Sequence, residues 1–408
     1  MNLSLKSAQL EDAHIVIPGS KSESNRLLIL SSLFKKLSLE NISNSDDTNY
    51  LLKALSSKSS TIDIGHAGTA MRFLTSYFSL TTKKEIELRG SQRMHNRPIK
   101  ILVDSLREIG ASIHYIDKEG YPPLLIKPSE LISKNLIIDS STSSQYISSL
   151  LLIAPKISGG LKIQLTGRET SKPYIDMTIS LLKKLGVEIT TTDNQISICE
   201  LQKIESKKHY IESDWSSASY FYSVVALAKI DYTLKLSKFS FKSLQGDSKV
   251  ADIYKSFGVK TTYKDDLIIL EKIESNTDKF SFDLTSNPDL AQTICVTCLG
   301  LGIKCNLTGL HTLKIKETDR LLALKKELSK FNLKVIITND SISFDNVDFL
   351  KPNVVIETYD DHRMAMSFAC LATKVKIIIK DPKVVSKSYS SFWSDLERIA
   401  IYLSLIHI

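Results

Sequence analysis

The chain has 408 residues, which is too many for one hydrophobic core, so we expect two or three domains. Hydrophobic residues make up 42% and charged residues 24%, as in ordinary globular proteins, and no apolar run approaches the ~20 residues that span a bilayer. The net charge is +8, but the lysines are scattered and form no basic block, which argues against nucleic-acid binding.

No cation cluster followed by an apolar run opens the chain, so we expect no signal peptide. Five cysteines, an odd number, are typical of a reducing compartment, and we therefore expect a cytoplasmic protein. Cys295 and Cys298 form a C-x-x-C, but no second pair or histidine cluster lies nearby and the neighbours are apolar. This pattern favours a buried helix over a zinc or redox site. We also interpret the apolar run 399–403 as part of a packed helix.

In chain order, the first polar motif is PGSKSESNR at residues 18–26, followed directly by an apolar run. We predict a loop that runs into a helix N-terminus, where serines cap free N–H groups and an anion is favoured. Lys21 and Arg26 add charge and directed donors for a phosphate or carboxylate. The spacing of a nucleotide phosphate loop is absent. An ordinary capped helix with solvated cations remains an alternative.

A helix followed by two short strand patterns recurs along the chain. Four such helices end 76, 72 and 74 residues apart, at Gly110, Gly186, Gly258 and Asn332. Asparagine tolerates the left-handed conformation of a helix end nearly as glycine does. Weaker copies at 48–55 and 392–403 bring the count to six. We therefore predict an α/β fold of two pseudo-symmetric domains, and no Rossmann sheet, because no G-x-G-x-x-G follows a strand.

Most of the predicted helices begin with a polar and often charged cluster, whereas their bodies are apolar. Capping explains one serine or aspartate at each start, but not the cations. These cations are Arg72, Arg97, Lys316, Arg320, Arg363 and Lys387. If the repeats are pseudo-symmetric, helix dipoles and cations converge and favour a small polyanion that carries phosphate and carboxylate. For any single cation, a structural salt bridge is the alternative.

Ten motifs, spread over essentially the whole chain, occur together in one known family and in the same order. In order they are PGSKSESNR, GHAGTAMR, SQRMHNRP, SSQYISSLL, SKPYIDMT, DWSSASYF, LQGD, KETDR, TYDDHRMAM and SKSYSSFW. Together they resemble the family of 5-enolpyruvylshikimate-3-phosphate synthases. The resemblance implies two domains, each of three βαβαββ repeats, with the active site in the interdomain cleft. It implies a lower domain of residues 20–212 and an upper domain of residues 1–19 and 213–408.

The resemblance also implies an activity: transfer of the enolpyruvyl group of phosphoenolpyruvate to the 5-hydroxyl of shikimate 3-phosphate, with release of phosphate. It implies no metal and no cofactor, small-molecule substrates as the only partners, and a monomer. The residues carried over for shikimate 3-phosphate are Lys21, Ser22, Arg26, Ser143, Ser144, Gln145, Ser171, Tyr174, Asp289, Thr312 and Lys316. Those carried over for phosphoenolpyruvate are Lys21, Gly68, Arg97, Gln145, Glu317, Arg320, His362, Arg363 and Lys387.

The implied reaction needs a base for the 5-hydroxyl and an acid for the methylene carbon. Asp289 is our choice of base for the 5-hydroxyl. Glu317 and Lys21 are both candidates for the acid that protonates the methylene carbon, and the sequence does not rank them. Lys316 would assist these proton transfers. Arginines would supply fixed positive charge in a closed site.

Three residues depart from the family pattern. His66 stands where the family usually has asparagine, and Phe73 stands where many members have proline. Thr312 occupies a position that asparagine or histidine often holds in the family.

Two other functions stay open. The first is the related transferase that acts on a UDP-aminosugar; it uses a loop cysteine, and none lies at 90–98. The second is a non-catalytic sensor of phosphate ligands that keeps the fold.

Overall fold

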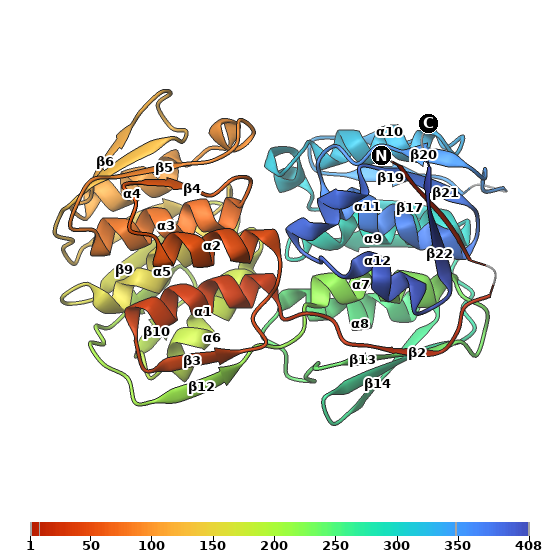
Figure 1. The fold of residues 1–408 in the computed structure, drawn as a ribbon, viewed down its shortest axis with the longest axis horizontal. Coiled ribbons are helices and arrows are strands. Elements are labelled where there is room, and N and C mark those ends of the chain that lie inside the picture. Colours follow the sequence, from red (N-terminus) through yellow and green to blue (C-terminus); the bar gives the residue numbers. More distant parts are fainter. Residues whose placement is uncertain (1, 8, 347–348, 407–408) are drawn as a thin grey trace. The chain divides into compact units, whose positions relative to one another are not determined.

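The computed structural model describes residues 2–7, 9–346 and 349–406. The chain forms two compact units. Residues 19–211 make up one, here called the middle unit, and the chain before residue 19 and from residue 212 on makes up the other, the terminal unit. Within each unit, helices fill the interior and strands lie toward the outside (Figure 1).

The described part of the middle unit holds six α-helices, two 3₁₀ turns and ten strands. Its helices are α1 (Lys21–Leu33), α2 (Asp46–Ser56), α3 (Gly68–Thr81), η1 (Met94–Asn96), α4 (Lys100–Glu108), α5 (Ser144–Ile153), η2 (Ala154–Lys156) and α6 (Lys172–Lys184). Its strands are β3 (Leu37–Glu40), β4 (Thr61–Asp63), β5 (Ile86–Arg89), β6 (Ser112–Tyr115), β7 (Leu124–Lys127), β8 (Asn135–Asp139), β9 (Leu161–Thr166), β10 (Ile189–Thr191), β11 (Gln195–Ile198) and β12 (Lys207–Tyr210).

The terminal unit is larger and is built from both ends of the chain. Its helices are α7 (Trp215–Leu227), η3 (Gly246–Lys249), α8 (Val250–Ile253), η4 (Tyr254–Phe257), η5 (Pro288–Leu290), α9 (Ala291–Leu301), η6 (His311–Ile315), α10 (Arg320–Ser329), α11 (His362–Ala369), η7 (Cys370–Thr373), η8 (Pro382–Lys387) and α12 (Phe392–Glu397). Its strands are β1 (Asn2–Ser7), β2 (Ala13–Ile15), β13 (Thr233–Ser237), β14 (Val259–Lys264), β15 (Leu267–Lys272), β16 (Lys279–Asp283), β17 (Lys304–Thr308), β18 (Ile336–Ile337), β19 (Ile342–Phe344), β20 (Val354–Ile356), β21 (Ile377–Lys380) and β22 (Ile401–Ile406).

The sheets repeat one plan, a parallel pair followed by two antiparallel neighbours. The middle unit has the orders β4-β5-β7-β6 and β8-β9-β11-β10, and a two-stranded parallel pair of β3 and β12. The terminal unit has the orders β2-β13-β15-β14, β16-β17-β19-β18 and β20-β21-β1-β22. The terminal unit therefore carries three four-stranded copies of one α/β design, and the middle unit carries two, together with the parallel pair β3 and β12. This arrangement confirms the pseudo-symmetry predicted from the repeat.

The four predicted helix ends are confirmed by their backbone conformation. Gly110, Gly186, Gly258 and Asn332 have φ angles of 103°, 94°, 72° and 62°. A left-handed residue at this place ends the helix and turns the chain into the following strand. Asparagine therefore performs in the fourth copy what glycine performs in the other three.

Buried hydroxyl groups link equivalent positions of the repeats. Ser219 of α7 and Ser367 of α11 each lie 3.3 Å from the hydroxyl of Thr293 of α9, and the three residues are spaced 74 apart in the sequence. One turn further along, Thr297 donates a hydrogen bond of 2.8 Å to Ser223, again 74 residues away. These helices are buried on nearly all faces, so their hydroxyls must find partners on one another.

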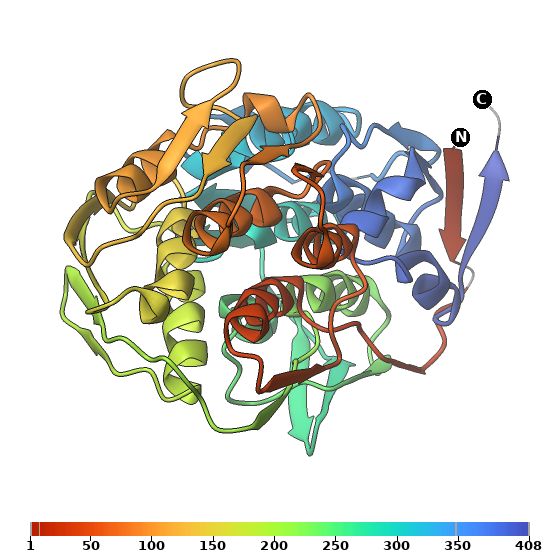
Figure 2. The ribbon, with the colours of Figure 1, turned by 60° about the vertical axis from the view of Figure 1, so that its left-hand side comes forward.

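The C-terminal run differs from its prediction. We predicted a packed helix through residues 399–403, but helix α12 ends at Glu397 and strand β22 begins at Ile401. Ala400 has a left-handed φ of 61°, which separates the two elements. Strand β22 pairs with β1 along its whole length, and Figure 2 shows the two strands side by side. Pairing with β1, which lies at the other end of the chain, therefore decides the conformation of residues 401–406.

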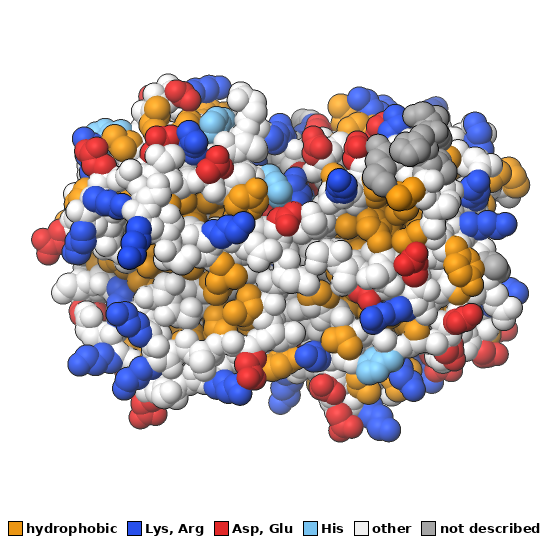
Figure 3. Space-filling view, viewed as in Figure 1, with side chains coloured by type: hydrophobic (Ala, Val, Ile, Leu, Met, Phe, Trp, Pro, Cys, Tyr) orange, Lys and Arg blue, Asp and Glu red, His pale blue; other side chains and the backbone are white. Residues whose placement is uncertain are grey.

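The helix that carries Cys295 and Cys298 is buried, as predicted. Among the described residues no helix is long and apolar enough to cross a membrane. On the face shown in Figure 3, lysines and arginines are interspersed with aspartates and glutamates.

Candidate active site

Arg320 is the centre of a cluster of charged side chains in the terminal unit. It begins helix α10, is 1% exposed, and contacts three carboxylates. Its Nη1 lies 2.9 Å from Asp289, its Nη2 2.8 Å from Glu317, and its Nε 2.7 Å from Asp361. A guanidinium held on three sides keeps a single orientation, as recognition of a planar anion requires.

Asp289 bridges this arginine to a second one. Its Oδ1 accepts from Arg320, and its Oδ2 lies 3.0 Å from Nη2 of Arg363. The backbone carbonyl of Asp289 also accepts a hydrogen bond of 3.2 Å from Nη1 of Arg363, and Lys316 lies 3.7 Å from Oδ1. Burial alone would raise the pKa of Asp289, but the charges of Arg363, Lys316 and Arg320 outweigh it and hold that pKa well below its usual range.

Local sequence rules explain how these side chains are positioned. Asp319 caps α10 by accepting from the N–H of Leu322 at 3.0 Å, which fixes the start of the helix at Arg320. Asp361 caps α11 by accepting from the N–H of Arg363 at 2.9 Å. Because its other oxygen holds Arg320, Asp361 ties the starts of both helices to one carboxylate.

Lys387 is attached to a turn with strained backbone. Tyr359 and Asp360, next to each other, have φ angles of 54° and 53°, a conformation that non-glycine residues seldom adopt. The Tyr359 hydroxyl donates to the buried carboxylate of Glu327 at 2.5 Å, and this bond holds the turn. The carbonyl of Asp360 accepts a hydrogen bond of 2.9 Å from Lys387. The turn therefore sets where the ammonium group lies.

Two acidic residues of this cluster were not assigned a role from the sequence. Asp361 belongs to the TYDDHRMAM motif, and its place before a helix start is a signal for capping. Asp247 belongs to LQGD, is buried, and accepts a hydrogen bond of 3.2 Å from Asn287. Burial, and then the charge of Asp289, raise the pKa of Asp247. The contact of Asp247 with Asn287, 40 positions away in the sequence, leaves no local signal.

In the middle unit, Arg26 ties three helices together. Its guanidinium donates to Thr178 at 2.7 Å, to the carbonyl of Ser22 at 2.9 Å, to Ser148 at 3.0 Å and to the carbonyl of Tyr174 at 3.1 Å. Burial lowers its pKa to about 10. Arg26 thus brings predicted residues of α1 and α6 together, and most of its donors serve the fold.

The start of helix α3 forms a second group in the middle unit. Gly68 is the first residue of α3, and a Cβ atom there would lie 2.2 Å from Nη1 of Arg97. Nε of Arg97 is buried and has no hydrogen-bond partner among the described residues. Gln145 of α5 reaches the same start, because its amide nitrogen lies 3.4 Å from Thr69. The first turn of α3 has no acidic residue, and the guanidinium of Arg97 lies beside it. Both the helix N-terminus and the cation attract negative charge, so an anion would bind favourably between them.

The remaining predicted residues of the middle unit lie at helix starts. Lys21 is the first residue of α1 and lies 3.7 Å from Asp47, and Ser20 caps that helix. Ser143 caps α5, and Ser144 is the first residue of that helix. Ser171 precedes α6 with a left-handed φ of 55°. The loop-to-helix prediction for residues 18–26 is therefore confirmed.

Two of the three departures have defined neighbours. His66 packs edge-on against Tyr50, with ring centroids 5.6 Å apart. Phe73 is buried, and its ring lies 5.4 Å from the guanidinium carbon of Arg26, so its face contacts a predicted binding residue. Thr312 is buried in η6, and its hydroxyl has no hydrogen-bond partner in the part of the chain that the structure describes.

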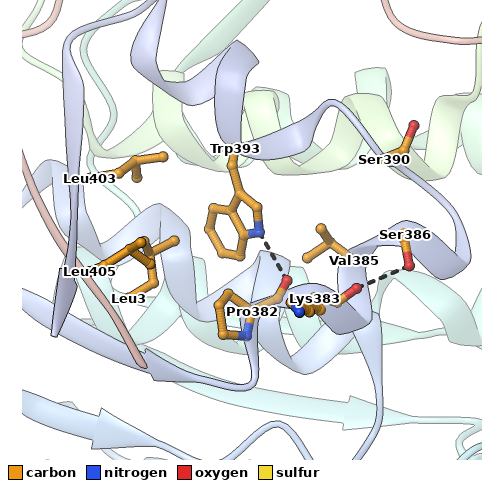
Figure 4. Close-up of a pocket in the computed structure, with 9 residues that line it drawn as sticks. All are labelled: Leu3, Pro382, Lys383, Val385, Ser386, Ser390, Trp393, Leu403 and Leu405. Carbon is orange, nitrogen blue, oxygen red and sulfur yellow. Dashed lines mark hydrogen bonds between the residues drawn. The ribbon is translucent and has the colours of Figure 1, made fainter. Parts of the chain in front are cut away.

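A separate hollow of about 470 Å³ lies in the terminal unit, beside Trp393. Figure 4 shows the indole donating to the carbonyl of Pro382 at 2.9 Å, with leucines of β1 and β22 around it. Its lining is mostly apolar with one lysine, which does not suit a small polyanion. Among the described residues, no group of three or more histidines, cysteines or acids is arranged to hold a metal ion.

Comparison with known proteins identifies the family. The family model described as EPSP synthase (3-phosphoshikimate 1-carboxyvinyltransferase) matches residues 53–396. The chain belongs to the EPSP synthase family. A member from Bacteroides fragilis (strain YCH46), named 3-phosphoshikimate 1-carboxyvinyltransferase, is 43% identical over 390 residues, which cover 95% of each chain. One of the same name from Histophilus somni (strain 2336) is 34% identical over 422 aligned positions, covering 95% of this chain and 96% of the relative.

A solved EPSP synthase from Acinetobacter baumannii has the same fold. Its TM-score is 0.80 at 20% identity, and the match covers 99% of this chain and all of that one. The two-domain EPSP synthase fold predicted from the motifs is therefore confirmed. The assignment of individual residues to substrates stays a prediction.

Proposed function

We propose that this member of the EPSP synthase family transfers the enolpyruvyl group of phosphoenolpyruvate to the 5-hydroxyl of shikimate 3-phosphate and releases phosphate. The observation that carries the proposal is the contact of Asp289 with both Arg320 and Arg363. It joins a carboxylate, which can take a proton, to a guanidinium pair, which can hold a phosphate. The names of the relatives support the same activity.

The proposed reaction runs by addition and then elimination. The oxygen of the 5-hydroxyl bonds to the central carbon of phosphoenolpyruvate, its proton passes to Asp289, and the methylene carbon takes a proton from Glu317 or Lys21. The new methyl group of the tetrahedral intermediate then returns a proton to the residue that donated it, the electron pair of that C–H bond forms the double bond, and the bond to the phosphate oxygen breaks. The products are the enolpyruvyl ether and inorganic phosphate. Lys316, 3.7 Å from Asp289, assists by its charge.

We assign phosphoenolpyruvate to the cations of both units and to the start of α3. Its proposed ligands are Lys21, Gly68, Arg97, Gln145, Glu317, Arg320, His362, Arg363 and Lys387. The contact of Arg97 with Gly68 supports an anion there, because a guanidinium and a helix N-terminus repel one another until an anion separates them.

We assign shikimate 3-phosphate to the hydroxyl-rich helix starts of the middle unit. Its proposed ligands are Lys21, Ser22, Arg26, Ser143, Ser144, Gln145, Ser171 and Tyr174, with Asp289, Thr312 and Lys316 of the terminal unit. Serine hydroxyls, two cations and an amide match a ligand that carries a phosphate, a carboxylate and hydroxyls. We also propose that residues 20–212 form one domain and residues 1–19 with 213–408 the other, and that the enzyme is a cytoplasmic monomer.

The test is phosphate release measured with both substrates and with each alone. We expect release only when phosphoenolpyruvate and shikimate 3-phosphate are present together. Release that needs a UDP-aminosugar instead would support the related transferase, and binding without release would support a sensor.

A pair of variants tests the base. Asp289→Asn should bind shikimate 3-phosphate and turn over at least ~100-fold more slowly, the scale for losing a general base. Asp252→Asn is the matched control, because Asp252 is an exposed carboxylate of the same unit that pairs with two lysines, at 3.0 and 2.8 Å. Wild-type turnover in Asp289→Asn would contradict the assignment of the base.

A further inference from the structure

The hollow beside Trp393 is separate from the proposed substrate site. Its described lining comes from the terminal unit alone, from β1, η8, α12, β22 and the turn between η8 and α12. It includes none of the residues assigned to either substrate. Its volume of about 470 Å³ is in the range of pockets that bind small molecules. The proposed function therefore leaves this cavity unused.

Apolar side chains form most of the wall. The indole nitrogen of Trp393 donates to the carbonyl of Pro382 at 2.9 Å, so the polar atom of the ring is satisfied within the protein (Figure 4). The rest of the ring borders the hollow as an apolar surface. Leu403 and Leu405 of β22 line it as well, and Leu405 is 59% exposed. An apolar ligand, and above all one with a flat ring, would remove these surfaces from water.

Lys383 gives the rim of the hollow a positive charge. Of its neighbours on the same segment, Lys380 pairs with Glu357 at 2.5 Å, and Lys387 donates to the carbonyl of Asp360 at 2.9 Å. The ammonium of Lys383 has no hydrogen bond or ion pair with any described residue, and none of the described lining residues is acidic. A single carboxylate complements one such cation, whereas a polyanion would leave most of its charge unmatched.

The turn η8 connects the hollow to the proposed phosphoenolpyruvate site. Pro382 and Val385 of η8 line the hollow, and its last residue, Lys387, is a proposed ligand of phosphoenolpyruvate. Both lining residues are buried, and η8 is only six residues long. A ligand packed against this turn therefore acts on it as one piece, and the position or the freedom of the Lys387 ammonium changes with it.

We propose that the hollow beside Trp393 binds a small aromatic carboxylate, and that this ligand changes the affinity for phosphoenolpyruvate through η8. The ring of the ligand lies against the indole and the leucines, and its carboxylate pairs with Lys383. The binding site does not depend on the enzymatic activity, whereas the coupling rests on the proposed function.

Binding is tested with 3-phenylpropionate, followed by tryptophan fluorescence, and with 3-phenylpropanol as its uncharged counterpart, measured in the same way. We expect a Kd of about 0.1–1 mM for the acid, the scale for a ligand of this size, and at least fivefold weaker binding of the alcohol. Trp393→Phe should remove the fluorescence change, because Trp215, the other tryptophan, is fully buried. No saturable change in the wild type, or the same change in Trp393→Phe, would overturn the proposal.

A pair of lysine variants tests where the carboxylate lies. Lys383→Gln should weaken the binding of the acid at least fivefold and leave the binding of the alcohol unchanged. Lys376→Gln is the matched control, because Lys376 is an exposed lysine of the same unit that does not line the hollow. It should bind the acid as the wild type does. Equal affinities of the two variants for the acid, as expected for a probe on the cations of the substrate site, would overturn the proposal.

Steady-state kinetics with saturating 3-phenylpropionate tests the coupling. We expect the KM for phosphoenolpyruvate to change at least threefold in the wild type and to stay constant in Lys383→Gln at the same concentration of the probe. An unchanged KM in the wild type with the probe bound would overturn the coupling. Fluorescence detects binding without turnover, so a failure of the proposed function and a failure of this site give different results.

Discussion

Gly68 shows how the absence of a side chain lets a neighbouring guanidinium group approach the start of a helix. Its Cα faces the guanidinium of Arg97 so closely that a Cβ would lie 2.2 Å from Nη1. Space for a methyl group exists only if Arg97 moves, and Arg97 is 8% exposed and has little room. The glycine is needed for close approach and not for its backbone freedom.

We predict that Gly68→Ala raises the KM for phosphoenolpyruvate by at least about tenfold, equivalent to ~1.4 kcal/mol of lost binding. The methyl group displaces a guanidinium assigned to that substrate. The affinity for shikimate 3-phosphate should change little and serves as the internal control. Steady-state kinetics checks this, and an unchanged KM for phosphoenolpyruvate would remove Arg97 and Gly68 from its site.

The lowered pKa of Asp289 predicts how the stability of the enzyme depends on pH. An unfolded aspartate titrates near ~3.9, and the folded pKa lies lower, so the stabilisation is present above the unfolded pKa and is lost as pH falls through the folded one. We expect Asp289→Asn to melt below the wild type, because Arg320 and Arg363 lose a shared partner.

The difference in Tm between the two proteins should be constant from about pH 8 to about pH 5 and should narrow below about pH 4. Thermal unfolding followed by circular dichroism measures it. A difference that changes mainly between neutral and mildly acidic pH would mean that the pKa of Asp289 is raised, and a difference that stays the same at every pH would mean that this pKa is not shifted.

At the scale of elements, helix starts and ends were the most predictable features. Glycine or asparagine marks the ends at residues 110 and 332, and serine or aspartate marks the starts of α5 and α7. These signals are local, and so the sequence contains them. Strand β22 was not predicted, because its conformation depends on pairing with β1 at the other end of the chain.

The partners of the cations were also not predictable. Arg26 donates to residues 122 and 152 positions away, and Arg320 to a carboxylate 41 positions away. Only the folded chain brings such residues together. The sequence therefore predicts that cations lie close together. The structure shows in addition that most hydrogen-bond donors of Arg26 serve the fold. It also shows that the carboxylate of Asp289 pairs with Arg320 and Arg363.

We expect the strained turn at Tyr359 and Asp360 to support the binding of phosphoenolpyruvate, because it positions Lys387. Tyr359→Phe removes the hydroxyl that holds this turn to Glu327, while the ring can keep its packing. We predict a several-fold rise in the KM for phosphoenolpyruvate, because Lys387 loses its fixed anchor, and an unchanged affinity for shikimate 3-phosphate. Tyr402→Phe on the exposed side of β22 is the matched control. Equal kinetics for the two variants would contradict the role of the turn.

At the scale of the whole molecule, the proposed ligands of shikimate 3-phosphate come from both units. If one ligand is held by residues of both units, we expect its binding to favour one compact arrangement of the units, and such closure would remove water before the intermediate forms. We predict that shikimate 3-phosphate lowers the radius of gyration measured by solution X-ray scattering, and that phosphoenolpyruvate binds better afterwards. A radius that does not depend on the ligand would contradict closure.

The most direct test of the account follows the phosphorus atoms during one turnover by ³¹P NMR. With both substrates present, we predict that the phosphoenolpyruvate signal is replaced by inorganic phosphate while the phosphate of the shikimate compound stays attached and shifts to that of the enolpyruvyl ether. Loss of phosphate from either substrate alone, or no change with both present, would contradict enolpyruvyl transfer by this chain.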